Sequence, residues 1–577
     1  MPDSMRYFLR ISPIVLIFIF TSCKKNEAEG PKPPVVIEDT TVVPGVDPVL
    51  AATIGFFLDD WQPRKFTAPA YIETKLPDVT GYSITVDASS IISKIPFSVF
   101  GTNAVMWMGP VAGDPTVITP VTNLNPHIIR FPGGSASDAY FWNAKQGVNP
   151  PDAPAEITDE NGVKKAPGYN YGMTDFNWQC SLDNYYSMLQ QTNSKGIITV
   201  NYGYARYGTG PNPVAAAAHM AADWVRYDNG RTQLWEIGNE NYGSWEWGYR
   251  IDKTLNKDGQ PEFLTGALYA QHFQVFVDSM RKAAAEVGNT LKIGAVTVES
   301  EPASWATDCV KTWNSGMMKG AGNKADFYVV HNYFSPYDQN SNAAVIFSSA
   351  ATVPQTMMSF VKQQFQANGV ETKPVVLDEW NMWAKDSKQQ VSNVSGGFAL
   401  TVLGEVLKNN FGMAARWDLL NGWDNGNDHG MFSSGNEPGV SKWSPRPSFY
   451  YLYFFQKMIG DRFVSVTGTP TLNSYASTYS SGQMNVTIIN TTSSAINVAV
   501  KTKNFRTGSR FYWYSLEGSN DNGEFSRKVL INGSGPTGVA GGPSDYATLK
   551  AFSATTTDGV KVKVPALGAV ILTIDKK

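Results

Sequence analysis

The sequence predicts an α/β protein, a (β/α)8 TIM barrel followed by an antiparallel β-sandwich. Its 577 residues exceed one ordinary domain and suit a large barrel with an accessory domain. Between residues 96 and 460, short apolar runs alternate eight times with stretches of helical spacing. After residue 460 the composition shifts to Thr, Ser, Val, Asn and Gly, with the short alternating runs that are typical of β-strands.

Eight apolar runs are predicted to be barrel strands, and the stretches between them helices. Strand–helix alternation with right-handed crossovers gives a parallel sheet, and eight repeats close it into a barrel. The expected helices span 182–191, 213–227, 264–287, 354–367, 399–408 and 448–459. The expected strands span 97–107, 126–132, 196–204, 234–240, 291–298, 325–332, 374–379 and 413–421.

Residues 1–23 have the pattern of a lipoprotein signal peptide. Arg6 and Arg10 precede an apolar run at 11–20, which is too short to cross a bilayer as a helix. Cys23 follows small residues at the end of this run and resembles the cysteine of a bacterial lipobox, so we expect it to carry lipid. The alternative is a plain secretory signal. Lipidation would place the protein in a bacterial cell envelope, facing the periplasm or the cell surface.

Two segments are expected to precede the barrel and one to follow it. Residues 24–50 are rich in Lys, Glu, Pro and Val, which predicts a disordered tether. Residues 51–95 contain one strand pattern, at 82–88, and are expected to join the C-terminal sandwich. The barrel is predicted over residues 96–460 and the sandwich over residues 461–577.

The composition argues against several classes of protein. With 47 basic and 50 acidic residues the net charge is −3, so neither nucleic acid nor an anionic membrane surface is an expected partner. Five histidines and two cysteines beyond Cys23 show no ligand-like spacing, so we expect no metal and no cofactor. Cys180 and Cys309 could pair in an oxidising compartment, and the sequence leaves this open.

Two glutamates, Glu240 and Glu379, come at the ends of the fourth and seventh predicted strands. In a (β/α)8 barrel the active site lies at the C-terminal ends of the strands. Glycoside cleavage needs an acid that protonates the leaving oxygen and a carboxylate that attacks the anomeric carbon or activates water. Strands four and seven face one another across the barrel mouth. This suits the separation of about 5–5.5 Å that retaining enzymes use.

Other polar and aromatic residues end the same strands and are predicted to bind the substrate. Arg130 could keep the nucleophilic carboxylate ionised by its nearby positive charge, or could instead form a structural ion pair. His331 or Tyr333 could donate a hydrogen bond to that carboxylate, or could be core residues. Asn239 is placed to contact a sugar hydroxyl. The further candidates are Asn201 and, as walls of the site, Trp380, Trp383 and Trp423.

Two more carboxylates near these strand ends are expected to have other roles. Glu236 lies two residues before the end of strand four, so we expect a deeper, paired structural charge. Asp378 precedes Glu379 directly and is expected to point away from it, because neighbouring side chains of a strand alternate between its faces.

The strings RFPGG at 130–134, WEIGNE at 235–240 and LDEWN at 377–381 resemble glycoside hydrolases of clan A, and most closely the α-L-arabinofuranosidases of family 51. The resemblance implies a retaining mechanism with Glu240 as acid/base and Glu379 as nucleophile. It also implies that Arg130 supports the nucleophile and that Asn239 binds the substrate. Because the acid must be protonated, Glu240 is expected in the more apolar or more anionic environment.

Two features depart from the family pattern. Family 51 members usually have Asn after the paired glycines, where this chain has Ser135, and the polar segment 421–432 is longer than expected. The first expectation is therefore an arabinofuranosidase acting on plant or algal glycans. Alternatives are an endo-acting glycanase, or another clan A glycosidase for xylosides, glucuronides or galactan-type polymers. From a different class, a non-catalytic glycan-binding lipoprotein stays open.

Overall fold

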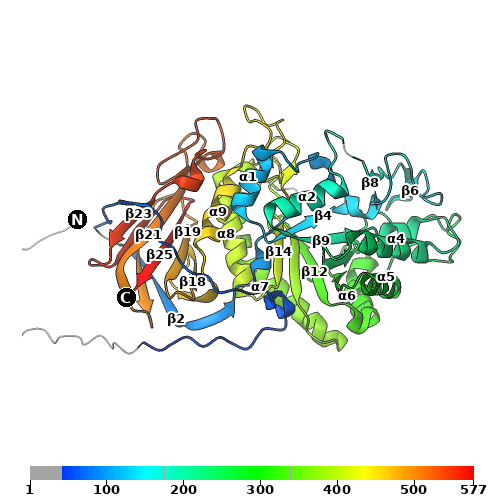
Figure 1. The fold of residues 1–577 in the computed structure, drawn as a ribbon, viewed down its shortest axis with the longest axis horizontal. Helices are drawn as coiled ribbons and strands as arrows, with labels where there is room; N and C mark the ends of the chain where they lie inside the picture. Colours follow the sequence, from blue (N-terminus) through cyan, green and yellow to red (C-terminus); the bar gives the residue numbers. More distant parts are fainter. Residues whose placement is uncertain (1–41, 79, 175, 338) are drawn as a thin grey trace, which may run out of the picture. The chain divides into compact units, whose positions relative to one another are not determined.

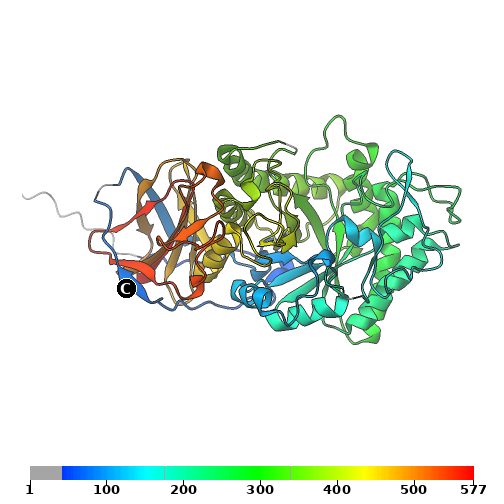
Figure 2. The ribbon, with the colours of Figure 1, turned by 90° about the horizontal axis from the view of Figure 1, so that it is seen from above.

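The computed structural model describes residues 42–577 except 79, 175 and 338. Cys23, the signal segment and the start of the tether lie outside the described residues, so lipidation stays a prediction. Residues 42–577 form one compact unit. Figure 1 shows a strand barrel wrapped by helices, beside a sheet built mainly from the C-terminal strands, and Figure 2 shows the same ribbon from above.

Eight parallel strands close into a barrel, as the sequence predicts. The last strand meets the first through the pairs Ala415–Gly101 and Arg416–Thr102. Gly101 is needed at this seam because a Cβ there would lie 2.4 Å from the Ala414 carbonyl oxygen. In chain order the barrel strands are β3 (Gly101–Asn103), β4 (Ile128–Phe131), β9 (Lys195–Val200), β10 (Leu234–Ile237), β11 (Lys292–Val296), β12 (Phe327–Asn332), β13 (Val375–Trp380) and β14 (Met413–Arg416).

Helices of the described chain surround the barrel. Several begin at a side chain that accepts a backbone N–H, which satisfies a donor that the first helical turn leaves unpaired. The helices are α1 (Pro115–Leu124), α2 (Leu182–Thr192), α3 (Gly203–Tyr207), α4 (Pro213–Asp228), α5 (Gly266–Glu286), α6 (Asp308–Ala321), α7 (Ala343–Asn368), α8 (Asn393–Lys408) and α9 (Pro447–Met458).

Three of these helices, α1, α3 and α6, were absent from the sequence-based prediction. In α1 the buried Val117, Val121 and Leu124 are separated by threonines and by Pro120, which hides the helical spacing. Within the described ranges, α7 is also long and apolar enough to cross a membrane. Its apolar face, including Ile346 and Phe347, is buried with the rest of the core, as in an ordinary barrel helix.

The C-terminal strands form a mixed sheet of 11 strands together with two strands from the N-terminal segment. Most of its pairs are antiparallel, but β2 runs parallel to β20 and β1 runs parallel to β23. The sheet therefore differs from the purely antiparallel prediction. Its strands are β1 (Tyr71–Glu73), β2 (Tyr82–Lys94), β17 (Arg462–Thr467), β18 (Leu472–Thr478), β19 (Met484–Asn490), β20 (Ile496–Lys503), β21 (Thr507–Gly518), β22 (Val529–Ile531), β23 (Ala551–Thr555), β24 (Val560–Val564) and β25 (Ala569–Lys576).

Alternate residues of this sheet enter two different apolar cores. Ile489 and Ile571 join the core shared with the barrel, whereas their neighbours Ile488 and Leu572 join a separate core within the sheet. The hydroxyl of Tyr475 also donates to Glu405 of α8 at 3.1 Å. The sheet is thus fixed against the barrel helices as well as by its own core.

Three two-stranded sheets lie in the loops that follow the barrel strands. They are β5 (Tyr140–Phe141) with β8 (Asn170–Tyr171), β6 (Ile157–Thr158) with β7 (Lys164–Lys165), and β15 (Leu420–Asn421) with β16 (Phe432–Ser433).

The sequence left open whether Cys180 and Cys309 form a disulfide. Cys309 is a buried thiol, so it forms no disulfide with Cys180 in this structure.

Candidate active site

Glu240 and Glu379 lie together at the C-terminal end of the barrel. Glu379 belongs to β13 and Glu240 follows β10 by three residues. His331, in β12, stands between them, and its Nδ1 lies 2.8 Å from Glu240 Oε1 and 3.9 Å from Glu379 Oε2. One ligand atom from each of the three residues lies within 4.8 Å of the others. The chain therefore holds two carboxylates at the short separation that the strand positions suggested.

Glu240 is held from both sides. Trp245 Nε1 donates to its Oε2 at 3.2 Å, opposite the contact with His331. Its backbone has φ +42°, in the left-handed region that residues other than glycine seldom adopt. Such backbone conformations cost free energy and persist where the surroundings impose them, which is common at functional sites.

Arg130 is fully buried and donates hydrogen bonds to four side chains around the site. Its Nε and Nη2 donate to the two oxygens of Glu236 at 2.9 and 3.0 Å. Its Nη1 donates to Glu379 Oε2 at 2.9 Å and to Asn103 Oδ1 at 3.2 Å, and its Nη2 also donates to Asn239 Oδ1 at 2.9 Å. Arg130 thus both anchors the deeper carboxylate Glu236 and presents positive charge to Glu379.

Asp378 does not point away from Glu379, contrary to the expectation from strand alternation. The register of β13 shifts between Leu377 and Trp380, which interrupts the alternation at this point. Asp378 Oδ1 lies 3.1 Å from His331 Nε2, while Glu379 reaches the same ring from its other side. Both carboxylates therefore belong to one buried network.

Tyr333 contacts the predicted nucleophile directly. Its hydroxyl donates to Glu379 Oε1 at 2.8 Å. The ring meets Trp383 edge-on with centroids 5.9 Å apart, and Trp383 in turn stacks on Tyr337 at 4.7 Å. Trp383 is thereby placed beside the site, whereas Trp423 lies partly exposed in the segment after β15, with Arg527 over its ring at 5.8 Å.

Two other predicted binding residues are placed elsewhere. Trp380 is 1% exposed and packs on Phe398 of α8, so its ring lies between the barrel and that helix and not in the site. The side chain of Asn201 is buried, with its amide donating to Tyr207 Oη at 3.1 Å and its oxygen accepting the Tyr204 backbone N–H at 2.9 Å. The Trp380 ring thus faces the helix layer and Asn201 supports a loop, so the structure adds no support to their predicted contacts with substrate.

The pKa values of the central groups follow from burial and from His331. Burial raises the pKa of Glu240, but hydrogen bonding and charge from His331, aided by Trp245, outweigh burial and bring it below its usual value. At Glu379 burial prevails over His331 and Arg130, so the pKa is raised. Burial lowers the pKa of His331, yet the surrounding carboxylates raise it well above its ordinary value. Glu240 is thus not in the pKa-raising environment expected for the acid, because His331 holds the proton beside it.

Sequence reasoning missed Glu246, which supports Asn239. The chain turns back between Glu240 and Gly243 and again between Gly243 and Glu246, so Glu246 returns to the site. Its Oε1 accepts from Asn239 Nδ2 at 3.0 Å and from Ser135 Oγ at 2.7 Å. Burial, with the nearby carboxylates, raises the pKa of Glu246 well above its usual value. The only sequence signal was the unusual Ser135.

The paired glycines of RFPGG follow β4 and lie against an aromatic ring. Gly133 and Gly134 have φ +69° and +63°. A Cβ at Gly134 would lie 2.7 Å from the Trp417 ring, and one at Gly133 would lie 3.0 Å from it. Trp417 follows β14 directly and meets Trp107 edge-on at 6.0 Å. The glycines thus allow this indole to close one side of the barrel mouth.

The triad of Glu240, His331 and Glu379 has donor atoms that a metal ion could use. The guanidinium of Arg130, 2.9 Å from Glu379 Oε2, already supplies positive charge there and would repel a cation. The donor set fits a hydrogen-bonded carboxylate pair better than a metal centre.

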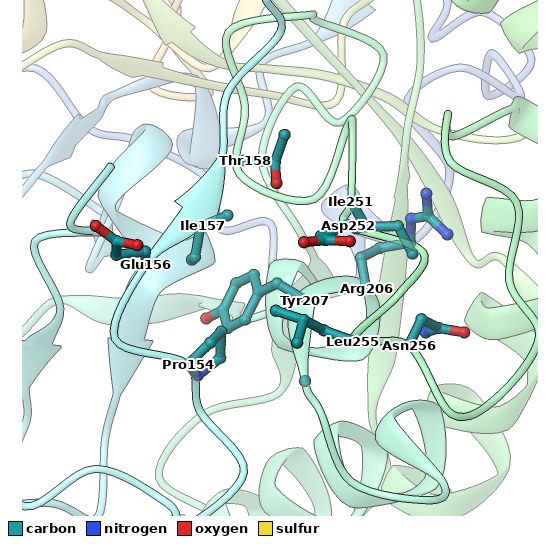
Figure 3. A pocket seen from close by; sticks show the side chains of 11 residues that line it. Pro154, Glu156, Ile157, Thr158, Arg206, Tyr207, Ile251, Asp252, Leu255 and Asn256 are labelled. Atoms are coloured by element: carbon teal, nitrogen blue, oxygen red, sulfur yellow. The ribbon is translucent and has the colours of Figure 1, made fainter. Parts of the chain in front are cut away.

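A separate hollow, shown in Figure 3, is lined by Tyr207 and Arg206 of α3 and by residues of the loops at 154–158 and 251–256. The Tyr207 ring points into this hollow. Neither Glu240 nor Glu379 lines it.

Curated proteins with similar sequences include arabinofuranosidases. Residues 120–342 match the family model described as "Alpha-L-arabinofuranosidase 1 domain". A probable α-L-arabinofuranosidase C of Aspergillus terreus is 22% identical over 295 residues, which are 46% of this chain and 50% of that protein. An intracellular exo-α-(1→5)-L-arabinofuranosidase of Acetivibrio thermocellus is 21% identical over 48% of this chain and 50% of its own length. The chain thus spans about half the length of these curated relatives.

Solved structures share the fold over most of the chain. The α-L-arabinofuranosidase of Thermotoga maritima, solved with arabinose, matches 85% of this chain and 99% of its own, with a TM-score of 0.57 and 16% identity. CelM2, a bifunctional glucanase-xylanase from a metagenome library, matches 86% of this chain and 99% of its own, with a TM-score of 0.55 and 12% identity. The resemblance first inferred from three short motifs is confirmed: the chain resembles the α-L-arabinofuranosidases of glycoside hydrolase family 51.

Proposed function

We propose that this protein is a retaining glycoside hydrolase that removes α-L-arabinofuranosyl groups from plant or algal glycans. The observation that carries the proposal is the carboxylate pair, with an oxygen each from Glu240 and Glu379 within 4.8 Å of one another. Retaining glycosidases place their carboxyl groups about 5–5.5 Å apart, whereas inverting ones leave about 6.5–9.5 Å for a water molecule. The short separation supports direct attack by one carboxylate.

In the first step Glu379 attacks the anomeric carbon while the bond from that carbon to the leaving oxygen breaks. Glu240 gives its proton to that oxygen, and a glycosyl–enzyme ester on Glu379 results. In the second step Glu240, now a carboxylate, takes a proton from a water molecule that attacks the same carbon. The ester bond breaks, Glu379 is released as a carboxylate, and the sugar leaves with its original configuration.

The residues around the pair supply charge and protons for these steps. Arg130 and Tyr333 both donate to Glu379, so they stabilise the negative charge that it carries before attack and regains on release. His331, between Asp378 and Glu240, holds a proton within hydrogen-bond distance of the acid. Transfer of that proton along the 2.8 Å contact would put Glu240 in the protonated form that the first step needs.

Other sugars are the main alternative. A glucanase-xylanase is among the structures that share this fold. Ser135, which donates to Glu246, also stands where the family usually has asparagine after the glycines. The same two steps would then act on a xyloside, a glucuronide or a galactan-type polymer. A non-catalytic glycan-binding protein would not need two carboxylates held beside a protonated histidine.

The test is hydrolysis of a panel of nitrophenyl glycosides by the chain from residue 24, with Glu379→Gln and Glu240→Gln. We expect release of arabinofuranose with retained configuration, measured by proton NMR, and complete loss in Glu379→Gln. Glu240→Gln should lose activity most on substrates with poor leaving groups, since these need the proton most. Inverted product, or full activity in Glu379→Gln, would refute the mechanism, and an active enzyme without arabinofuranosidase activity would change the sugar only.

We also propose that Cys23 carries the lipid that anchors the protein to the bacterial cell envelope. The support is the signal pattern at residues 1–23 alone. Incorporation of a labelled fatty acid into the wild-type chain, and its loss in Cys23→Ser, would test this directly.

A further inference from the structure

Aromatic rings, three of them exposed and one partly buried, follow four neighbouring strands of the barrel. Trp245 follows β10, Trp305 follows β11, Tyr337 follows β12 and Trp383 follows β13, and these strands are adjacent in the barrel in that order. Trp305 is 88% exposed, Tyr337 69% and Trp245 58%. The rings therefore occupy consecutive loops on one half of the barrel mouth.

Such exposure is unusual for these residue types. Tryptophan is highly buried on average, and clusters of exposed apolar groups on a soluble protein mark binding surfaces. Trp305 is not part of the barrel core. Tyr337 stacks on Trp383, which belongs to the same set of rings. Trp245 and Trp383 also pack on Tyr242 and Tyr333, but packing of this kind does not account for the exposure of Trp305.

Both ends of this set reach the proposed catalytic carboxylates. At one end Trp245 Nε1 donates to Glu240 Oε2 at 3.2 Å. At the other end Trp383 meets Tyr333, whose hydroxyl donates to Glu379.

The segment that carries Trp305 is tied to the same mouth. Asn332, the last residue of β12, donates to Glu299 of this segment at 3.2 Å. The charge of Glu240 also contributes to a raised pKa of about 7 at Glu299, after burial. The loop that leads to Trp305 is therefore joined to the barrel mouth at Glu299.

We propose that Trp245, Trp305, Tyr337 and Trp383 form a platform for the sugar units beyond the cleaved bond, so that the substrate is a glycan chain and not a small glycoside. This inference rests on the proposed function. The C–H faces of sugar rings are apolar and flat enough to pack on aromatic rings, while their hydroxyls stay in water. Four rings on consecutive loops would contact successive sugar units of one chain.

The experiment compares hydrolysis of a polysaccharide with hydrolysis of the nitrophenyl glycoside that the wild-type protein cleaves. The variants are Trp305→Ala, Tyr337→Ala and the double variant, with Trp305→Tyr as the conservative replacement. Tyr82→Ala, at the start of β2 in the C-terminal sheet and 38% exposed, is the matched control. Thermal unfolding of each variant checks that the fold is kept.

We expect kcat/KM for the polysaccharide to fall about three- to tenfold for each ring removed, as for other aromatic contacts. The loss should appear in KM, recover in Trp305→Tyr, and leave the small glycoside unchanged. Equal losses on both substrates, or no loss on the polysaccharide, would overturn the proposal.

A failure of the proposed function is recognised separately. If the wild-type protein cleaves no glycoside, affinity electrophoresis in gels that contain the polysaccharide still tests the platform. Retardation of the wild-type chain that Trp305→Ala and Tyr337→Ala weaken would support it, and equal mobility of all variants would overturn it.

Discussion

Glu246 accepts a hydrogen bond from the side-chain amide of Asn239 at 3.0 Å, and this contact fixes which way the amide points. Arg130 can only donate, so the oxygen of Asn239 must face it, at 2.9 Å. The amide nitrogen then faces Glu246. The same Glu246 oxygen, Oε1, also accepts a hydrogen bond from the Ser135 hydroxyl at 2.7 Å. The orientation of Asn239 beside Glu240 is thus set by a residue seven positions later in the chain.

Glu246→Ala should lower kcat/KM because Asn239 loses the acceptor that orients it. A buried amide left without its partner costs about 1–3 kcal/mol, which corresponds to a loss of about five- to 150-fold if it is felt in the transition state. Glu246→Gln keeps an oxygen acceptor and should retain most activity. Steady-state kinetics on the nitrophenyl substrate check both variants, and wild-type kcat/KM in Glu246→Ala would show that Asn239 needs no such support.

Tyr333→Phe should shift the acid limb of the pH–activity profile to higher pH. The nucleophile acts as a carboxylate, so activity rises as Glu379 loses its proton. The Tyr333 hydroxyl donates to the ionised form and lowers the pKa of Glu379, against the burial that raises it. Removing that donor raises the pKa further, and a higher pH is needed for ionisation.

The measurement for Tyr333 is kcat/KM against pH for the wild-type protein, Tyr333→Phe and a control. Tyr328→Phe serves as that control, because Tyr328 lies on β12, the strand that Tyr333 follows directly, but packs on Phe365 of α7. A limb that stays in place in Tyr333→Phe, or that moves equally in both variants, would contradict this account.

The positions of the two central glutamates could be predicted because they depend on strand order alone. Glu240 and Glu379 follow apolar runs four and seven, and in a closed parallel barrel these runs must end at the same rim. The contact of Arg130 with Glu379 was one of the two roles that its place near the end of β4 suggested, and the ion pair with Glu236 adds the other. A buried strand can be recognised from a short apolar run, and the runs that end at these two glutamates are distinct in the sequence.

The errors arose where the chain departs from ideal geometry or where contacts join distant residues. The register shift in β13 brings Asp378 and Glu379 inward together and turns Trp380 outward. No pattern of residues in the sequence predicts this shift. Glu246 contacts Ser135 across 111 positions of sequence. The parallel pairing of β2 with β20 depends on the direction in which a distant segment enters the sheet.

Arg130→Lys should destabilise the fold strongly. A lysine ammonium cannot reproduce the forked contacts of a buried guanidinium with Glu236, Glu379 and Asn239. Leaving buried carboxylates without their partner costs about 3–5 kcal/mol. Urea denaturation measures the loss, with Arg250→Lys as the control. Arg250 pairs with Glu262 at 2.7 Å in a partly exposed position, where such a pair contributes about 1 kcal/mol or less. Equal losses for the two variants would mean that the buried network adds nothing.

Gly134→Ala should destabilise the protein and weaken activity, because Trp417 would have to move. The glycine has φ +63°, and a Cβ would lie 2.7 Å from the indole. With ψ −173° as well, this backbone conformation is one that essentially only glycine adopts, so an alanine there costs about 1–3 kcal/mol, and displacing a packed ring adds about 1–3 kcal/mol. Gly147→Ala separates the two contributions, since Gly147 has φ +75° and a Cβ there would meet no atom within 4 Å.

Urea denaturation should therefore show a larger loss of stability for Gly134→Ala than for Gly147→Ala. Only Gly134→Ala should change the near-ultraviolet circular dichroism of the tryptophans. Equal losses would show that Trp417 adjusts freely, and that the second glycine of RFPGG serves the backbone turn alone.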